Sequence, residues 1–208
     1  MRRGPGRTQW AAITAVALAL LFAGGAVTVA SAERDEAPRT PATDSADAGF
    51  ARDMSVHHQQ AVEMSFIVRD RTRDESVRRL AYDIANTQAN QRGMMLGWLD
   101  IWGLPKLQSG VEPMTWMGMG TGAGADGALM PGMATNAQMD ALREASGREA
   151  EVLYLKLMTE HHKGGVHMAQ GCVQKCAPGV ERDLAQGMVD AQQSEILLMA
   201  DMLRKRGA

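Results

Sequence analysis

Apolar side chains recur at intervals of three and four residues in four segments of the chain, which predicts four amphipathic helices. The expected helices cover residues 47–68, 75–102, 136–170 and 180–206. Asp47 or an adjacent residue is expected to cap the first helix, and Thr135 the third. A charged turn at residues 69–74 and a Gly- and Cys-containing break at residues 171–179 separate the paired helices. No strand pattern rises above noise, so we expect an all-α protein.

The first and third helices carry the same motif. Residues 54–64 (Met-Ser-Val-His-His-Gln-Gln-Ala-Val-Glu-Met) return as residues 158–168, and a shift of 104 positions relates the two without a gap. The same shift carries Leu80 and Leu99 of the second helix onto Leu184 and Leu203 of the fourth. Such an internal duplication predicts two equivalent helical hairpins. We expect them to pack around a pseudo-twofold axis as an antiparallel four-helix bundle over residues 49–206.

The N-terminus has the features of an export signal. Three arginines precede an apolar run from Trp10 to Ala30, and Ala30-Ser31-Ala32 has the small residues of a cleavage site. Residues 1–32 are therefore expected to be a secretory signal peptide. An uncleaved membrane anchor is the alternative, because the run is long enough to span a bilayer. Residues 33–48 are rich in Pro, Thr, Asp, Ala and Ser and are expected to form a disordered tether in a secreted or extracytoplasmic protein.

Composition directs attention to the repeated motif. All 5 histidines of the chain lie in its two copies, and the chain has 16 methionines but only 4% aromatic residues. The net charge of −2 and the absence of a basic cluster after the signal argue against a nucleic-acid partner. Cys172 and Cys176 are the only cysteines, and export predicts a disulfide between them. A thiolate metal pair is the alternative for these two residues.

Each copy of the motif predicts a stripe of possible metal ligands, because residues three and four apart share a helix face. The candidate ligands are Met54, His57, His58 and Met64 in the first copy, and Met158, His161, His162, His167 and Met168 in the second. The partner helices add inward positions that are expected to support these ligands: Gln88, Met95, Gln192, Glu195 and Met199.

The ligand types favour copper. Thioether sulfur with imidazole nitrogen suits copper and above all Cu(I), whereas zinc gains little from methionine; Cu(II) and zinc stay open. The Gly-rich segment 104–134 is long for a structureless loop. Its methionines are expected either to capture Cu(I) weakly or to fill a loose lid over the bundle: Met114, Met117, Met119, Met130 and Met133.

Two other interpretations remain open. In the first, the four paired histidines are packed core residues that hydrogen-bond to Gln88 and Gln192 without any metal. In the second, the protein is a ferritin-like metal-dependent oxidase, but the Glu-x-x-His motif of the di-iron bundles does not occur in the chain. No nucleophile elbow, phosphate loop or haem-attachment motif is present, so we expect no catalysis. Self-association is not decided by the sequence.

The repeated motif, the Met130-Pro131-Gly132-Met133-Ala134-Thr135 segment, and the Gln192-x-x-Glu195-x-x-x-Met199 pattern closely resemble the exported "domain of unknown function 305" family. The likeness runs from about Phe50 to Leu203. It implies a ferritin-like helical fold, and in some members copper binding and copper tolerance outside the cytoplasm. By position it implicates the methionines and paired histidines of both motif copies. The chain departs from the family pattern at Gln91, where an acid is common, at Gly164-Gly165, and at His167 with the two cysteines.

Overall fold

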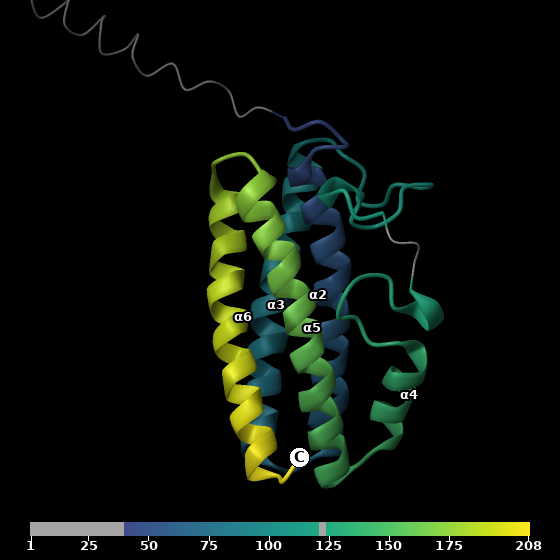
Figure 1. Cartoon of the computed structure of the whole chain (residues 1–208), viewed down its shortest axis with the longest axis vertical. Helices are drawn as coiled ribbons and strands as arrows, with labels where there is room; N and C mark the ends of the chain where they lie inside the picture. Colours follow the sequence, from purple (N-terminus) through teal and green to yellow (C-terminus); the bar gives the residue numbers. More distant parts are fainter. Residues whose placement is uncertain (1–39, 121–123) are drawn as a thin grey trace, which may run out of the picture. The chain divides into compact units, whose positions relative to one another are not determined.

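The computed structural model of the chain describes residues 40–120 and 124–208 (Figure 1). The predicted signal peptide and residues 33–39 of the predicted tether lie outside the described residues, as do residues 121–123 of the long loop. Of the predicted tether, residues 40–48 are described, and Ala46, Asp47 and Ala48 already belong to the first helix. Within the described part every regular element is a helix and no strand occurs. No described helix is both long and apolar enough to cross a membrane.

Four long helices form the body of the protein: α2 (Ala46–Arg71), α3 (Glu75–Ile101), α5 (Gly147–Lys175) and α6 (Val180–Lys205). Helix α2 packs mainly against α3, α5 packs mainly against α6, and α2 and α5 join the two hairpins. Figure 1 shows the four helices side by side. The all-α four-helix bundle built from two hairpins is therefore confirmed.

Side-chain caps fix the starts of the first two helices. The Ser45 hydroxyl accepts the backbone N–H of Ala48 at 3.2 Å, so α2 is capped two residues before Asp47. The Asp74 carboxylate accepts the N–H groups of Ser76 and Val77, each at 3.0 Å. Both contacts satisfy N–H groups that have no partner inside a helix. The α2–α3 turn is only residues 72–74, because α2 continues to Arg71.

The prediction of a single third helix is wrong, because two helices occupy that region. Helix α4 covers Asn136–Glu144, and a capping box between Thr135 and Gln138 caps its N-terminus. Ala145 and Ser146 are extended, and Gly147 has a φ of 53°, so the chain turns before α5 begins. The predicted break at Gly171 is also wrong. Helix α5 continues past Gly171 to Lys175, and a Cβ at Gly171 would lie only 2.6 Å from Met117 Cε, so glycine makes room for the loop there.

The core consists of two clusters of buried apolar side chains, one toward each end of the bundle. The turn-end cluster lies near the α2–α3 turn and includes Met64, Met139, Met158, Met199 and Met202. The disulfide-end cluster lies where α2 begins and α5 ends, and it includes Met54, Met95, Met114, Met130, Met168, Met188, Cys172 and Cys176. Methionine thus takes much of the space that aromatic residues fill in other cores.

The 104–134 segment is packed against the bundle. It contains two short 3-10 turns, η1 (Thr115–Met117) and η2 (Ala125–Gly127), and runs with α4 along the side of the bundle in Figure 1. Helix α2 contacts both η1 and α4. Met114, in the 104–134 segment, is fully buried and has a φ of 69°, a left-handed backbone conformation that a non-glycine residue rarely adopts. The described part of the segment, residues 104–120 and 124–134, is therefore packed on the surface of the core rather than forming a loose lid.

Candidate functional site

Four histidines lie buried at the level between the two core clusters. His57 and His58 come from α2, and His161 and His162 from α5; none is more than 1% exposed. The rings of His57 and His161 lie face to face across the two helices, with centroids 3.7 Å apart and an interplanar angle of 33°. The outer rings, His58 and His162, lie 6.5 and 6.4 Å from their neighbours in sequence. The structure therefore brings both predicted histidine pairs together.

The outer histidines are oriented by the partner helices. His58 Nε2 lies 2.9 Å from Oε1 of Gln91 on α3, and His162 Nε2 lies 2.7 Å from Oε2 of Glu195 on α6. The shift of 104 residues that relates the two motif copies also relates these two contacts. One acceptor is an amide and the other a carboxylate, so the two hairpins differ in charge at equivalent positions.

The inner histidines are oriented by backbone carbonyls. His161 Nε2 lies 3.0 Å from the carbonyl oxygen of His57, and His57 Nε2 lies 3.3 Å from that of Pro131. Pro131 belongs to the long loop, which reaches α5 at Gly164: a Cβ on Gly164 would overlap the Pro131 carbonyl group. Pro131 and Gly164 were not among the predicted site residues, because nothing in the sequence indicates where the loop meets the helix.

These contacts fix the position of the ring protons. Every Nε2 atom faces a carbonyl, amide or carboxylate oxygen, and such an oxygen can only accept a hydrogen bond. In the neutral ring Nε2 therefore carries the hydrogen, and Nδ1 carries the free lone pair. All four Nδ1 atoms are buried, and none has a hydrogen-bond partner among residues 40–120 and 124–208. The site holds four oriented imidazoles whose basic nitrogens are left free.

Burial keeps three of these rings, those of His57, His58 and His161, uncharged. Desolvation lowers the pKa of His57 to about 3, and desolvation together with the neighbouring charge of His57 lowers the pKa of His58 to about 3. The pKa of His161 is also well below its ordinary value, because of burial first and the nearby His57 second. At neutral pH the lone pairs of these three rings are free to bind a metal ion.

The prediction that Gln88 and Gln192 are the hydrogen-bond partners of the histidines is wrong. Gln91 and Glu195, one turn further along each helix, make these contacts, while Gln88 Oε1 and both polar atoms of Gln192 have no partner. Gln192 packs against Gly165, where a Cβ would lie 3.2 Å from its Cδ. Three side-chain polar atoms therefore remain unsatisfied beside the histidines, in addition to the four Nδ1 atoms.

The motif methionines flank the histidines on both sides. Because α2 and α5 are antiparallel, Met54 lies with Met168 in the disulfide-end cluster and Met64 lies with Met158 in the turn-end cluster. Each end thus combines one thioether from each copy of the motif. Met95 and Met199 from the partner helices join the same two clusters.

His167 was predicted as a metal ligand, but the structure places it apart from the other four histidines. It is exposed, whereas the other four histidines are buried, because five residues after His162 the helix presents its opposite face. In the described residues the only group of three or more His, Cys, Asp or Glu ligand atoms within 4.8 Å of one another is Asp47, Cys176 and Glu181. The four histidines do not form a three-nitrogen centre by themselves, so an ion bound to them would also need sulfur or oxygen ligands.

The loop methionines do not form an exposed capture site. Met114 and Met130 are buried, and Met117, Met119 and Met133 are partly buried against the disulfide-end cluster. Asp53 holds this part of the loop, since its Oδ2 accepts the backbone N–H of Met114 at 2.7 Å and the indole N–H of Trp116 at 2.9 Å. Sequence reasoning did not find Asp53, because the two groups that donate hydrogen bonds to it lie about sixty residues further along the chain.

Replacing Asp53 with Ala is expected to lower the free energy of unfolding by about 1–3 kcal/mol, because two partly buried N–H groups lose their acceptor. Urea denaturation measures the change, and amide exchange at Met114 should accelerate. Asp140→Ala is the control, because it removes an exposed i,i+3 ion pair with Arg143 and should cost no more than about 0.5 kcal/mol. Equal effects of the two variants would show that Asp53 does not hold the loop.

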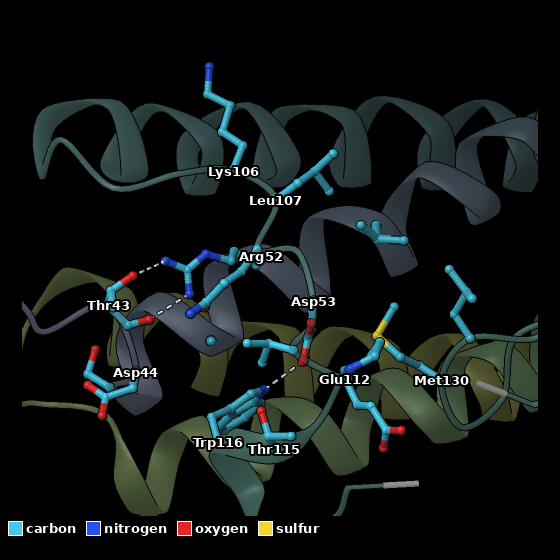
Figure 2. Close-up of a pocket in the computed structure, with 17 residues that line it drawn as sticks. Thr43, Asp44, Arg52, Asp53, Lys106, Leu107, Glu112, Thr115, Trp116 and Met130 are labelled. Carbon is cyan, nitrogen blue, oxygen red and sulfur yellow. Dashed lines mark hydrogen bonds between the residues drawn. The ribbon is translucent and has the colours of Figure 1, made fainter. Parts of the chain in front are cut away.

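A pocket of about 340 Å³ lies between the start of α2 and the loop, and Figure 2 shows its lining. Its central cation, Arg52, donates to the carbonyl oxygens of Pro105 and Thr43, each at 2.7 Å, and to the Thr43 hydroxyl. Asp53 is engaged with the loop. None of the four buried histidines lines this pocket. Its polar groups hold the loop and the N-terminal segment together, so the candidate site is the histidine cluster.

Comparison with known proteins identifies the family. The profile "Domain of unknown function (DUF305)" matches residues 47–203, and no curated protein matches the chain. A solved DUF305 structure from Streptomyces coelicolor is 70% identical, covers 80% of this chain and 97% of its own, and has a TM-score of 0.75. A DUF305 fragment from Deinococcus radiodurans is 31% identical, with coverages of 77% and 96% and a TM-score of 0.63.

CopM in its Cu(I)-bound form has the same fold at 21% identity, with coverages of 76% and 96% and a TM-score of 0.55. Cu(II)-bound and Ag-bound forms of CopM also match. The match of the family profile spans the whole helical bundle, from the first turn of α2 to the end of α6. The chain belongs to the DUF305 family.

Proposed function

We propose that this chain is an extracytoplasmic copper-binding protein that buffers the ion or passes it on, without catalysis of its own. The observation that carries the proposal is the set of four buried imidazoles whose Nε2 hydrogens are fixed by oxygen acceptors and whose Nδ1 atoms have no partner. Histidines that bind metals have this arrangement, since the ring nitrogen that does not bind the metal donates to a carbonyl or carboxylate. Four unpartnered acceptors in a core are otherwise costly.

The donor set fits copper better than zinc. Structural and catalytic zinc sites use at least three nitrogen, sulfur or oxygen ligands around one ion, and no three histidine nitrogens converge within 4.8 Å in the described residues. Soft Cu(I) accepts thioether together with imidazole. His57, His58, His161 and His162 would hold copper no more than two at a time, together with methionines from the adjoining clusters, among them Met54, Met168, Met64 and Met158.

The two hairpins are proposed to hold copper unequally. The Glu195 carboxylate that accepts from His162 brings a negative charge close to a bound cation, whereas the Gln91 amide beside His58 contributes no charge. The half containing α5 and α6 should therefore bind the ion more tightly. Glu195→Gln makes the two halves alike and should weaken that tighter site by about 10- to 100-fold, the usual effect of removing such a partner.

The comparisons support this proposal at two points. CopM, which shares the fold, is known in Cu(I)-, Cu(II)- and Ag-bound forms, so a bundle of this kind accommodates soft monovalent ions. The Streptomyces coelicolor relative, which is 70% identical, is described as inferred to be secreted. An exported location agrees with the arginines and the apolar run at the N-terminus.

A matched pair of histidine substitutions tests the proposal. The double variant His58→Gln/His162→Gln removes one imidazole from each hairpin and keeps a polar side chain near Gln91 and Glu195. His167→Gln makes the same change on the exposed face of α5. Titration with Cu(I) against a competing chelator, with circular dichroism to verify folding, should show at least about a tenfold loss of affinity for the double variant. His167→Gln should bind like the parent.

The contrary result is equally clear. A folded double variant that binds copper as the parent does would leave the histidines as packed core residues and end the metal interpretation. The single variant Glu195→Gln gives a second measurement that leaves all four imidazoles in place.

A further inference from the structure

A second group of ligand atoms lies at the end of the bundle where α2 and α6 begin. The carboxylates of Asp47 and Glu181 and the sulfur of Cys176 lie within 4.8 Å of one another. Asp47 is in the first turn of α2, Glu181 is in the first turn of α6, and Cys176 caps the end of α5. The backbone N–H of Ala177 donates to Asp47 Oδ1 at 3.1 Å and joins the α5–α6 connection to α2. Figure 1 shows this connection at the same end of the bundle as the start of α2.

Glu181 is the unusual member of this group. Its side chain is 5% exposed, and neither carboxylate oxygen has a hydrogen-bond partner in the described residues. A buried carboxylate without a hydrogen bond or a nearby cation is strongly unfavourable. Burial first, and the charge of Asp47 second, raise the pKa of Glu181 to about 9. A bound cation would supply the missing positive charge to both carboxylates.

The third member of the group is chemically blocked in the folded protein. Cys176 is joined to Cys172 in a disulfide, and a disulfide sulfur is a poor metal ligand compared with a thiolate. Cys172 is not part of the three-atom group, although it is the disulfide partner. Breaking the bond would therefore release one thiol inside the group and one outside it.

We propose that Asp47, Glu181 and Cys176 form a second metal site, which the Cys172–Cys176 disulfide keeps closed and its reduction opens. Two carboxylates and one thiolate suit a divalent ion of borderline softness, of the Zn²⁺ class, with one further position for water. The site shares no residue with the histidine cluster. It therefore stands or fails independently of copper binding there.

The opening step is a thiol–disulfide exchange. A dithiol reductant supplies two electrons and two protons; the Cys172–Cys176 bond breaks, both sulfurs become thiols, and the reductant becomes a disulfide. The metal ion then displaces the proton from the Cys176 thiol and any proton held by the two carboxyl groups. Both cysteines are nearly fully buried, so the exchange requires the last turn of α5 to open.

Two cysteine variants separate the two sulfurs. Cys172→Ser leaves the Cys176 thiol permanently free, whereas Cys176→Ser leaves only the thiol that lies outside the group. Each is kept reduced with a phosphine and titrated with Co²⁺, whose thiolate charge-transfer absorption reports sulfur ligation and is not given by imidazole or thioether. Cys172→Ser should show the absorption at one Co²⁺ per chain, and Cys176→Ser should show none. The oxidised parent should also show none.

The carboxylates are tested in the Cys172→Ser background. Adding Glu181→Gln should weaken Co²⁺ binding by at least about tenfold. The control is Glu149→Gln, which changes an exposed acid in the first turn of α5 and should leave Co²⁺ binding unchanged. Reduced parent protein provides a measurement without any substitution and should behave as Cys172→Ser does. Equal absorption in the two cysteine variants, or no thiolate absorption in reduced parent protein, would overturn the proposal.

Discussion

Acidification from pH 7 to pH 5 is expected to remove on the order of 4 kcal/mol of stability from the metal-free protein through its buried histidines. Glu181 opposes this loss by about 2.5 kcal/mol, because its pKa is raised to about 9 in the folded state and the folded chain takes up its proton first. His57 and His58 have pKa values of about 3 in the folded state, against an ordinary 6.5 when the chain is unfolded. Below pH 6.5 the unfolded chain therefore binds protons that the folded chain does not, and stability falls until the pH reaches about 3. At pH 5 each ring contributes about 2 kcal/mol of this loss. His161, whose pKa is lowered in the same direction, adds to it.

Urea denaturation of the metal-free protein at pH 7, 6 and 5 measures this loss as a shift of the midpoint at constant m-value. His58→Gln removes one of the buried titrating rings, so its stability should depend less steeply on pH. His167→Gln keeps all four buried rings and should retain the full dependence. A His58→Gln variant whose stability depends on pH as steeply as that of His167→Gln would show that the buried ring is not held neutral by the fold.

The second large effect is expected at Gly164. A Cβ there would overlap the Pro131 carbonyl group and lie 3.1 Å from Gly132 Cα, and these are backbone atoms that cannot rotate away. Gly164→Ala should therefore lower the free energy of unfolding by about 1–3 kcal/mol and push the 131–132 segment off α5. His57 would lose its Pro131 acceptor as a result. Thermal and urea denaturation give the stability change, and copper titration gives its effect on the site.

Substitutions at two other helix glycines serve as controls for the stability change of Gly164→Ala. Gly165→Ala meets only the flexible end of the Gln192 side chain, so it should cost less than Gly164→Ala. Gly187 in α6 has nothing within 4 Å of the added Cβ, so Gly187→Ala should stabilise the protein by up to about 1 kcal/mol through helix propensity. A Gly164→Ala variant that gains stability as Gly187→Ala does would mean that the loop does not rest on α5.

The helices could be predicted because burial imposes a period on the sequence. The starts of α3 and α6 follow from the spacing of apolar residues and from the turn residues before them. The break at Ala145–Gly147 was missed because apolar residues continue at helical spacing on both sides of it. Gly171 lies inside α5 instead of ending it, and its missing side chain leaves room for Met117, which comes from a distant segment. Local sequence does not encode such a contact.

The site could be predicted as far as the repeat determined it. Duplication identified the four histidines, and antiparallel packing placed them together. The repeat could not distinguish Gln88 from Gln91. Both lie on the inward face of α3, and only the exact rotation of the helix decides which of them reaches His58. His167 was included because it belongs to the motif, although its helical angle places it outside. Backbone acceptors such as Pro131 leave no trace in side-chain patterns.

Each end of the bundle holds one motif methionine from each copy of the motif, and this arrangement has a mechanical consequence. Met54 shares a core cluster with Met168 at one end and Met64 shares one with Met158 at the other, so neither hairpin contains both motif methionines of a given end. An ion bound at either end through sulfur from both copies would tie α2 to α5 as a cross-link does. Because such an ion binds only when the hairpins are docked, loading would resist their separation by mass action. Copper would then act as a reversible staple between the two halves of the bundle.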